Sequence, residues 1–228
     1  MKIPLYLAMT AAEFQNAAVL PRQVAWMACH FSPYGRGISN PPTRLPEGSM
    51  LILNDRIPYC GHDPEQIARE LLQLAQQFSC ESILLDLQRD DQAAAEVVNA
   101  VCALPLPVGV SERYAKEQPI VFLSALPIRA DTEAVLSKWR GKELWLELTE
   151  QQLYCDITEA GARFSHANCN HSTLPHFDEA LCCRYGAEVC EDKVRFTITQ
   201  DKEILEQLLA RAQQLGISKA IALYQQFG

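Results

Sequence analysis

Two polar residues, one inside a short apolar run and one directly after it, could contribute to a binding or catalytic site. Asp86 lies within the apolar run 82–87, and Gln88 follows two residues later. An unpaired carboxylate is costly to bury, so Asp86 needs either a polar partner or a solvated cavity. Side chains of a strand alternate between its faces, which places Asp86 and Gln88 with Leu84 and leaves the opposite face apolar. We therefore predict that both polar side chains point into a pocket.

Further polar residues stand at the ends of other apolar runs. These candidates are His30, Asp55, Glu112, Ser124, Glu147 and Tyr224. Two carboxyl groups can act together as acid and base or nucleophile in a glycosidase, where they lie about 5–5.5 Å apart in retaining enzymes and about 6.5–9.5 Å apart in inverting ones. The ordinary alternative is that each side chain caps a helix or is solvated in a loop.

The elements that position these residues alternate between strands and helices. Thr10 and Glu13 have the spacing of a capping box, and Asp63-Pro64 is a typical helix start. Helices are predicted after Thr10, from 63 to 78, and over 92–102, 132–139 and 200–215. Strands are predicted over 3–9, 23–31, 50–54, 82–87, 107–111, 119–124, 143–148 and 219–224.

Eight such strands indicate an α/β fold of the (β/α)8 TIM-barrel type, with some helices trimmed. We expect one barrel domain over 1–228, with a β-rich antiparallel insertion over 151–198 before the last long helix. The long Pro- and Gly-rich loop 32–49 has the length of a functional loop. In a barrel of this kind the site lies at the C-terminal ends of the strands. An open doubly wound sheet is the alternative, but no glycine-rich phosphate loop follows any strand, so we expect no nucleotide cofactor.

Composition excludes several classes of protein. Twenty basic and 28 acidic residues give a net charge of −8, which argues against a nucleic-acid partner. No apolar run approaches the ~20 residues that span a bilayer, so no membrane partner is expected. Nine cysteines without a signal-peptide pattern predict reduced thiols and a cytoplasmic protein. The adjacent Cys182 and Cys183 are expected on a buried strand. The sequence does not indicate the oligomeric state.

A metal site is a further possibility, because several residues of zinc-ligand type lie close together. His166, Cys169, His171 and His176 fall within eleven residues, and the tripeptide 60–62 adds a Cys and a His. Their spacing matches no standard structural zinc pattern, which usually pairs two Cys-x-x-Cys-type units. We therefore expect a polar loop and no metal.

The layout resembles that of glycoside hydrolase family 18, the chitinase-like barrels. The stretch 63–89, a capped helix leading into Glu81 to Gln88, resembles the unit of that family that carries the motif DxxDxDxE on its fourth strand. The stretch 192–224 resembles the end of the same barrels, where an antiparallel insertion precedes a helix. The last strand of the family closes with an aromatic residue in the sugar site, and Tyr224 stands there.

The resemblance implies a changed catalytic motif. Glu81 takes the first Asp position, Leu84 replaces the second, Asp86 keeps the third, and Gln88 replaces the catalytic Glu. In the family that Glu protonates the glycosidic oxygen, and the neighbouring Asp positions the substrate acetamido group. Glutamine cannot donate a proton as a general acid, so we expect this chemistry to be lost.

Two function classes follow, with a third that involves no ligand. The first is a non-catalytic barrel that binds a saccharide or another small polar ligand through Asp86, Gln88, Tyr224, Asp55 and His30. The second is an active hydrolase that uses other carboxylates, drawn from Glu112, Glu147, Asp55 and Asp86. The third is a scaffold whose barrel is plugged because Asp86 and Gln88 only satisfy each other.

Overall fold

A computed structural model describes residues 2–33, 37–57, 61, 63–89, 92–126, 128, 131–166 and 174–228. Eight parallel strands form a closed barrel, which confirms the predicted TIM-type fold. In chain order these strands are β1 (Leu5–Met9), β2 (Val24–Phe31), β4 (Met50–Asn54), β5 (Ser82–Asp86), β6 (Val108–Ser111), β7 (Ile120–Leu123), β8 (Glu143–Leu148) and β14 (Ile217–Leu223). The pairing of β1 with both β2 and β14 closes the barrel.

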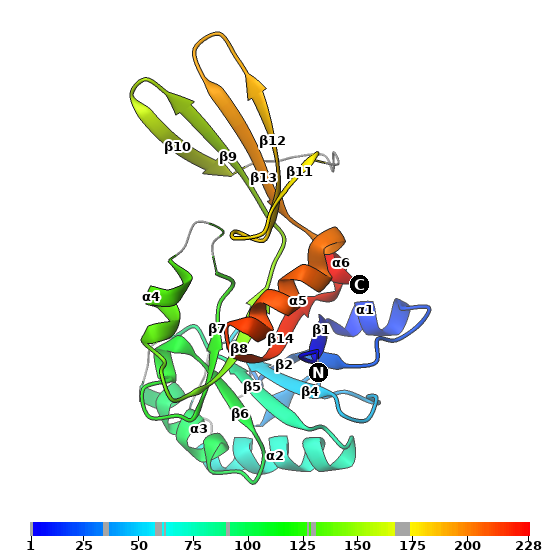
Figure 1. Cartoon of the computed structure of the whole chain (residues 1–228). Helices are drawn as coiled ribbons and strands as arrows, with labels where there is room; N and C mark the ends of the chain where they lie inside the picture. Colours follow the sequence, from blue (N-terminus) through cyan, green and yellow to red (C-terminus); the bar gives the residue numbers. More distant parts are fainter. Residues whose placement is uncertain are drawn as a thin grey trace.

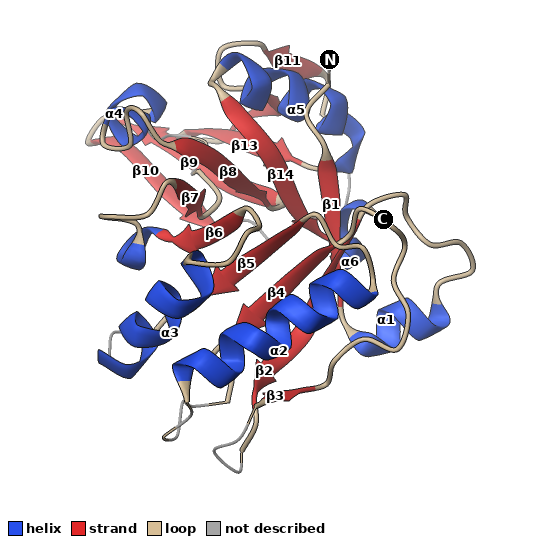
Figure 2. Cartoon of the chain, turned by 90° about the horizontal axis from the view of Figure 1, so that it is seen from below, coloured by secondary structure: helices blue, strands red, loops and turns tan. Residues whose placement is uncertain are grey.

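Helices surround the barrel on the outside (Figure 2). They are α1 (Ala11–Asn16), α2 (Pro64–Gln77), α3 (Gln92–Cys102), α4 (Thr132–Ser137) and α5 (Leu205–Gln214), with α6 (Tyr224–Phe227) at the C-terminal end. The predicted helix starts are confirmed: Thr10 and Glu13 form a capping box, and the Asp63 side chain caps α2 with Pro64 at its start. Only the short 3-10 helix η1 (Glu112–Tyr114) stands between β6 and β7.

The alternation of side chains along the strands produces two apolar layers. Ile83 and Leu85 of β5 pack outward against the helices, whereas Leu84 joins the cluster inside the barrel. That interior cluster consists of Tyr6, Ala8, Ala25, Met50, Ile52, Leu84, Ile120, Phe122, Trp145 and Ile221. The predicted division of the run 82–87 into an inner and an outer face is therefore correct.

The N-terminal end of the barrel is closed by a charged and aromatic cluster. Lys219 Nζ donates to Glu81 Oε1 (2.7 Å) and lies 4.9 Å from the centre of the Trp145 ring and 5.3 Å from that of Tyr6. The Tyr6 hydroxyl also donates to Glu81. Burial alone raises the pKa of Glu81, but the hydrogen bonds from Lys219 and Tyr6 and the Lys219 charge lower it overall. Glu81 is thus a structural residue far from the strand C-termini.

We expect Lys219→Met to lower the free energy of unfolding at neutral pH by about 1–2 kcal/mol, less than for a fully buried pair because Glu81 is 44% exposed. A lowered carboxyl pKa stabilises the fold above the unfolded value of about 4.3, and this contribution is lost as the pH falls through the folded value. The difference between wild type and variant should therefore shrink in acid. Urea denaturation at pH 7 and pH 3 measures it.

The exposed pair of Lys2 with Glu206 provides the control. Lys2→Met removes the same charge and should leave the free energy of unfolding unchanged within error. Equal losses in the two variants would show that the cluster around Lys219 contributes nothing specific.

The insertion after β8 is a five-stranded antiparallel sheet that projects from the barrel (Figure 1). Its spatial order is β10 (Gly161–His166), β9 (Gln151–Thr158), β13 (Val194–Gln200), β12 (Cys183–Val189) and β11 (His176–Asp178). The 3-10 helix η2 (Lys202–Ile204) then leads into α5. The predicted hairpin around 159–161 is confirmed by the antiparallel pairing of β9 with β10.

The cysteines in the described ranges are free thiols, and most are buried: Cys29, Cys80, Cys102, Cys155, Cys182, Cys183 and Cys190. Cys183 begins β12, whereas Cys182 lies before the strand with φ +51°, so only one of the adjacent pair is on a strand. No described helix has the length and apolar character needed to cross a bilayer.

Candidate functional site

A cavity of about 630 Å³ lies at the C-terminal ends of the barrel strands. Its polar wall contains His30, Asn54, Asp55, Asp86, Gln88 and Glu147, contributed by four strands and the loops after them. The apolar floor is formed by Leu84, Ile52, Phe122 and Ile221. Gln88 is exposed and Asp86 is half-buried, so solvent reaches the cavity. The barrel is thus open at this end, in contrast to the plugged scaffold considered above.

Asp86 and Gln88 form the centre of the polar wall. Gln88 Nε2 donates to Asp86 Oδ1 over 2.6 Å. Burial raises the pKa of Asp86; the hydrogen bond from Gln88 opposes this shift, and the nearby Asp55 charge adds to it. Both side chains face the cavity, as the alternation of the strand predicts. The pair therefore presents carboxylate and amide groups, which together can accept and donate hydrogen bonds.

The backbone of the loop after β5 is fixed by three neighbouring elements. Buried Asp55 accepts from the backbone N–H groups of Gln88 (2.8 Å) and Arg89 (2.7 Å) through one oxygen, Oδ2. Ser111 Oγ donates to the Leu87 carbonyl (2.8 Å), and the Tyr114 hydroxyl donates to that of Arg89. Asp55 therefore holds Gln88 in place as well as lining the cavity.

Glu147 supplies a second half-buried carboxyl group to the same cavity. It lies on the face of β8 that also carries Trp145, which points into the barrel. Burial raises the pKa of Glu147; a hydrogen bond from the Ala125 backbone N–H (3.4 Å) opposes the shift, and the Asp86 charge adds to it. Within the described ranges neither Asp86 nor Glu147 forms an ion pair. Two carboxyl groups thus face the cavity without an ion-pair partner among the described residues, although Arg56 also lines the cavity.

The remaining polar wall comes from β2, β4 and the long loop. Asn40 Nδ2 donates to His30 Nε2 (3.2 Å), and the Asn40 carbonyl accepts from Trp26 Nε1 (3.0 Å). Asn54 Nδ2 donates to the Met27 carbonyl (2.9 Å), and its Oδ1 accepts from the Arg56 backbone N–H (3.2 Å). Asn40, Asn54 and Arg56 also line the cavity but were not predicted from the sequence. The polar end of the run 50–54 was the available signal for Asn54.

Two predicted site residues lie elsewhere. Glu112 is exposed in η1 and is not among the residues that line the cavity. Tyr224 begins α6 and packs against the outer apolar layer. Ile221 and Leu223 line the cavity, but β14 ends at Leu223 and the chain turns into α6 at Tyr224, which is not among the lining residues. Ser124, in contrast, does line the cavity.

The residues considered as metal ligands are not assembled by the described structure. His166 ends β10 and His176 begins β11, which are opposite edge strands of the five-stranded sheet. Cys169, His171 and the Cys and His of the tripeptide 60–62 lie outside the described residues. Among the residues that are described, no group of three or more potential ligands comes together.

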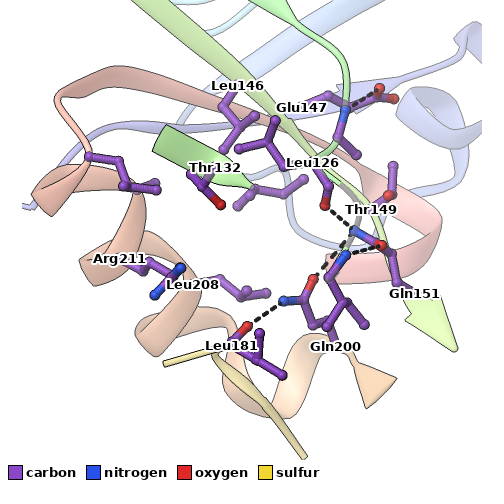
Figure 3. A pocket seen from close by; sticks show the side chains of 15 residues that line it. Leu126, Thr132, Leu146, Glu147, Thr149, Gln151, Leu181, Gln200, Leu208 and Arg211 are labelled. Atoms are coloured by element: carbon purple, nitrogen blue, oxygen red, sulfur yellow. Dashed lines mark hydrogen bonds between the residues drawn. The ribbon is translucent and has the colours of Figure 1, made fainter. Parts of the chain in front are cut away.

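A second pocket, of only about 60 Å³, lies where the insertion joins the barrel (Figure 3). Gln151 Nε2 donates to the Leu126 carbonyl (2.7 Å) and to Gln200 Oε1 (3.3 Å), while Gln200 Nε2 donates to the carbonyls of Leu181 and Cys182. These bonds satisfy buried amides at the base of the inserted sheet. The pocket has room for only a few water molecules, and its hydrogen bonds connect the inserted sheet to the barrel.

Comparison with known proteins identifies the fold. No family model matches the sequence, and no curated protein matches it. Solved structures do match: a spore cortex-lytic enzyme of Bacillus cereus has a TM-score of 0.57 at 11% identity, covering 97% of this chain and 71% of that chain. A class V chitinase mutant of Nicotiana tobaccum in complex with NAG4 has a TM-score of 0.57 at 8% identity, covering 97% and 93%.

A chitinase-like agglutinin from Robinia pseudoacacia is also similar, with a TM-score of 0.55 at 10% identity, covering 95% of this chain and 93% of that chain. The similarity to these barrels extends over almost the whole chain. The resemblance in layout to glycoside hydrolase family 18 is thus confirmed at the level of the fold.

Proposed function

We propose that this chitinase-like barrel has lost hydrolase activity and binds a saccharide or another small polar ligand at the C-terminal ends of its strands. The observation that carries the proposal is the cavity of about 630 Å³ with Asp86 and Gln88 directed into it. Its size lies within the range of small-molecule sites, and a few convergent polar groups over an apolar floor are typical of such sites.

The chemistry of the polar wall suits a ligand rich in hydroxyl groups. Carboxylates of Asp86 and Glu147 accept hydrogen bonds, while the amide of Gln88 can both donate and accept. The similar structures support a saccharide in particular, since one is a chitinase in complex with NAG4 and another is a chitinase-like agglutinin. Only one aromatic residue, Phe122, is found in the described lining, so we expect hydrogen bonds to contribute more than ring stacking.

Calorimetric titration tests the binding proposal. Short oligomers of N-acetylglucosamine and of glucose should be titrated into the wild-type chain, with a sugar-free polyol as the control. We expect saturable heat for at least one saccharide series. Only the heat of dilution, with every saccharide at concentrations up to the millimolar range, would contradict the proposal.

The loss of hydrolysis gives a separate prediction. We expect no release of reducing ends from short chitin oligomers, because Gln88 stands where the family has its proton donor. Gln88→Glu alone should not restore full activity, since buried Leu84 replaces the Asp that helps to tune the ionisation of its neighbour in the family. Turnover by the wild type that disappears in Asp86→Ala would contradict the proposal.

One observation favours an active hydrolase as a second candidate. Asp86 and Glu147 face one cavity, and burial raises the pKa of both, which is the environment of a carboxylic acid that donates a proton. Under this alternative the wild type would turn over a saccharide, and Glu147→Gln would abolish turnover while leaving binding intact. Glu112 does not enter this alternative, because it lies outside the cavity lining.

A further inference from the structure

The two faces of the projecting sheet differ sharply in character. Antiparallel partners lie on the same face of a sheet, so the register assigns each side chain to one side. One side, which we name the apolar face, includes the cross-strand pairs of β9 with β13: Leu153 with Ile198, Cys155 with Phe196, and Ile157 with Val194. The register extends this face onto β12 through Ala187, opposite Phe196, and Val189, opposite Val194.

The opposite face carries the charges of the sheet. Asp156 accepts from Arg195 Nε (2.6 Å) and from Lys193 Nζ (3.0 Å). The Arg195 guanidinium lies 4.6 Å from the centre of the Tyr154 ring. This charged face is compatible with solvent, and Asp156 is paired there with two cations.

The outer part of the apolar face is exposed in the isolated chain. Ile157 is 44% exposed and Val189, near the end of the β12–β13 hairpin, is 83% exposed. The rings of Tyr185 and Phe196 lie side by side on this face, with centres 6.4 Å apart. In the described part of the chain the strands of this sheet pair only with one another (Figure 1). The apolar face of a sheet is stable when another layer of the fold buries it, and packing against a second sheet is one common arrangement.

We propose that the apolar face is the interface with a second copy of this chain, joined face to face as a sheet sandwich. The register also places Ala162 and Phe164 of β10 on this face, opposite Ile157 and Cys155. With strands about 4.8 Å apart and a rise of about 3.3 Å per residue, these four strands present a flat area of about 450 Å² per copy. Two such faces together have a flat area of about 900 Å². The uneven surface of the side chains adds to this area, which brings the buried surface to the ~1,000 Å² at which a specific interface begins.

The neutral character of the apolar face lets two copies approach there, although the rest of each chain is acidic. Each copy carries a net charge of −8, so two copies repel each other over most of their surfaces. The paired positions of β9, β12 and β13 on the apolar face carry no Asp, Glu, Lys or Arg. A saccharide would leave its hydroxyl groups without partners on such a surface, whereas a symmetric dimer places the same neutral patch on both sides.

Sedimentation velocity of the full chain over a wide concentration range tests this proposal. We expect a concentration-dependent dimer in the wild type. Ile157→Lys should raise the dimer dissociation constant by about a hundredfold or more, because the buried charge is present in both copies. The matched control is Ser165→Lys, an exposed position on the other face of neighbouring β10, which should leave the dimer unchanged.

Circular dichroism shows whether each variant folds. If Ile157→Lys does not fold, Val189→Lys, at the most exposed position of the face, tests whether the face forms the dimer. A wild type that stays monomeric at every concentration would overturn the proposal. So would a dimer that persists in both apolar-face variants. A monomeric wild type whose saccharide binding is lost in Ile157→Lys would overturn it in favour of a ligand-binding wall.

Discussion

Gly109→Ala is expected to lower the free energy of unfolding by about 2–3 kcal/mol, the upper range for overpacking a core. A Cβ at Gly109 on β6 would lie 2.4 Å and 2.5 Å from two carbon atoms of the Trp145 ring. Trp145 is fully buried inside the barrel, where its Nε1 donates to Glu143 (2.8 Å). The ring can move only by breaking this hydrogen bond or displacing the neighbouring side chains of the interior cluster.

Chemical denaturation measures the loss, and Gly186→Ala is the matched control. A Cβ at Gly186 would lie 3.3 Å from a Leu174 side-chain carbon and 3.4 Å from one of Pro175, which a surface sheet can accommodate by a small shift. The control should therefore lose much less stability. If the two substitutions cost the same, the Trp145 ring does not occupy the space beside Gly109.

Asp86→Ala is expected to weaken saccharide binding by about 10–100-fold. A hydrogen bond to a charged group contributes about 1.5–3 kcal/mol, and every 1.4 kcal/mol corresponds to a factor of ten in affinity. The substitution also frees Gln88, whose Nε2 is otherwise directed to Asp86 over 2.6 Å. Calorimetric titration with the saccharide that binds best measures the change.

The control for this variant is Asp192→Ala, which removes the same charge from an exposed turn of the inserted sheet. It should bind like the wild type. Equal affinity of Asp86→Ala and the wild type would place the ligand elsewhere on the molecule.

The stability of Asp86→Asn carries independent information. Burial raises the pKa of Asp86 in the folded chain, so its ionised form destabilises the fold above that pKa, and the penalty is relieved as the pH falls through it. We therefore expect Asp86→Asn to be at least as stable as the wild type at pH 7. A carboxylate kept at a cost in stability is typical of a functional position.

Much of the fold could be predicted from local sequence patterns. The predicted strands 50–54, 82–87 and 143–148 correspond to the barrel strands β4, β5 and β8, and Asp63 and Thr10 cap helices as predicted. These features depend on neighbours within a few residues, so the sequence contains the whole signal. The inward direction of Asp86 follows from the same alternation.

The composition of the site depends on contacts between distant segments, and here prediction was less successful. Asp55 reaches the backbone of Gln88 and Arg89, more than thirty residues away, which no local pattern encodes. Asn40 enters the cavity wall from a long irregular loop. Tyr224 was misplaced because the strand was expected to continue through it, whereas β14 ends at Leu223 and the chain turns into α6.

A crystal of the wild-type chain soaked with a tetramer of N-acetylglucosamine tests the central claim most directly, because one density map shows both where the sugar binds and whether it is intact. We predict an unbroken saccharide in the cavity at the strand C-terminal ends, with hydroxyl or amide groups in contact with Asp86 and Gln88. Density for cleaved products, or an empty cavity at saturating sugar, would contradict the account.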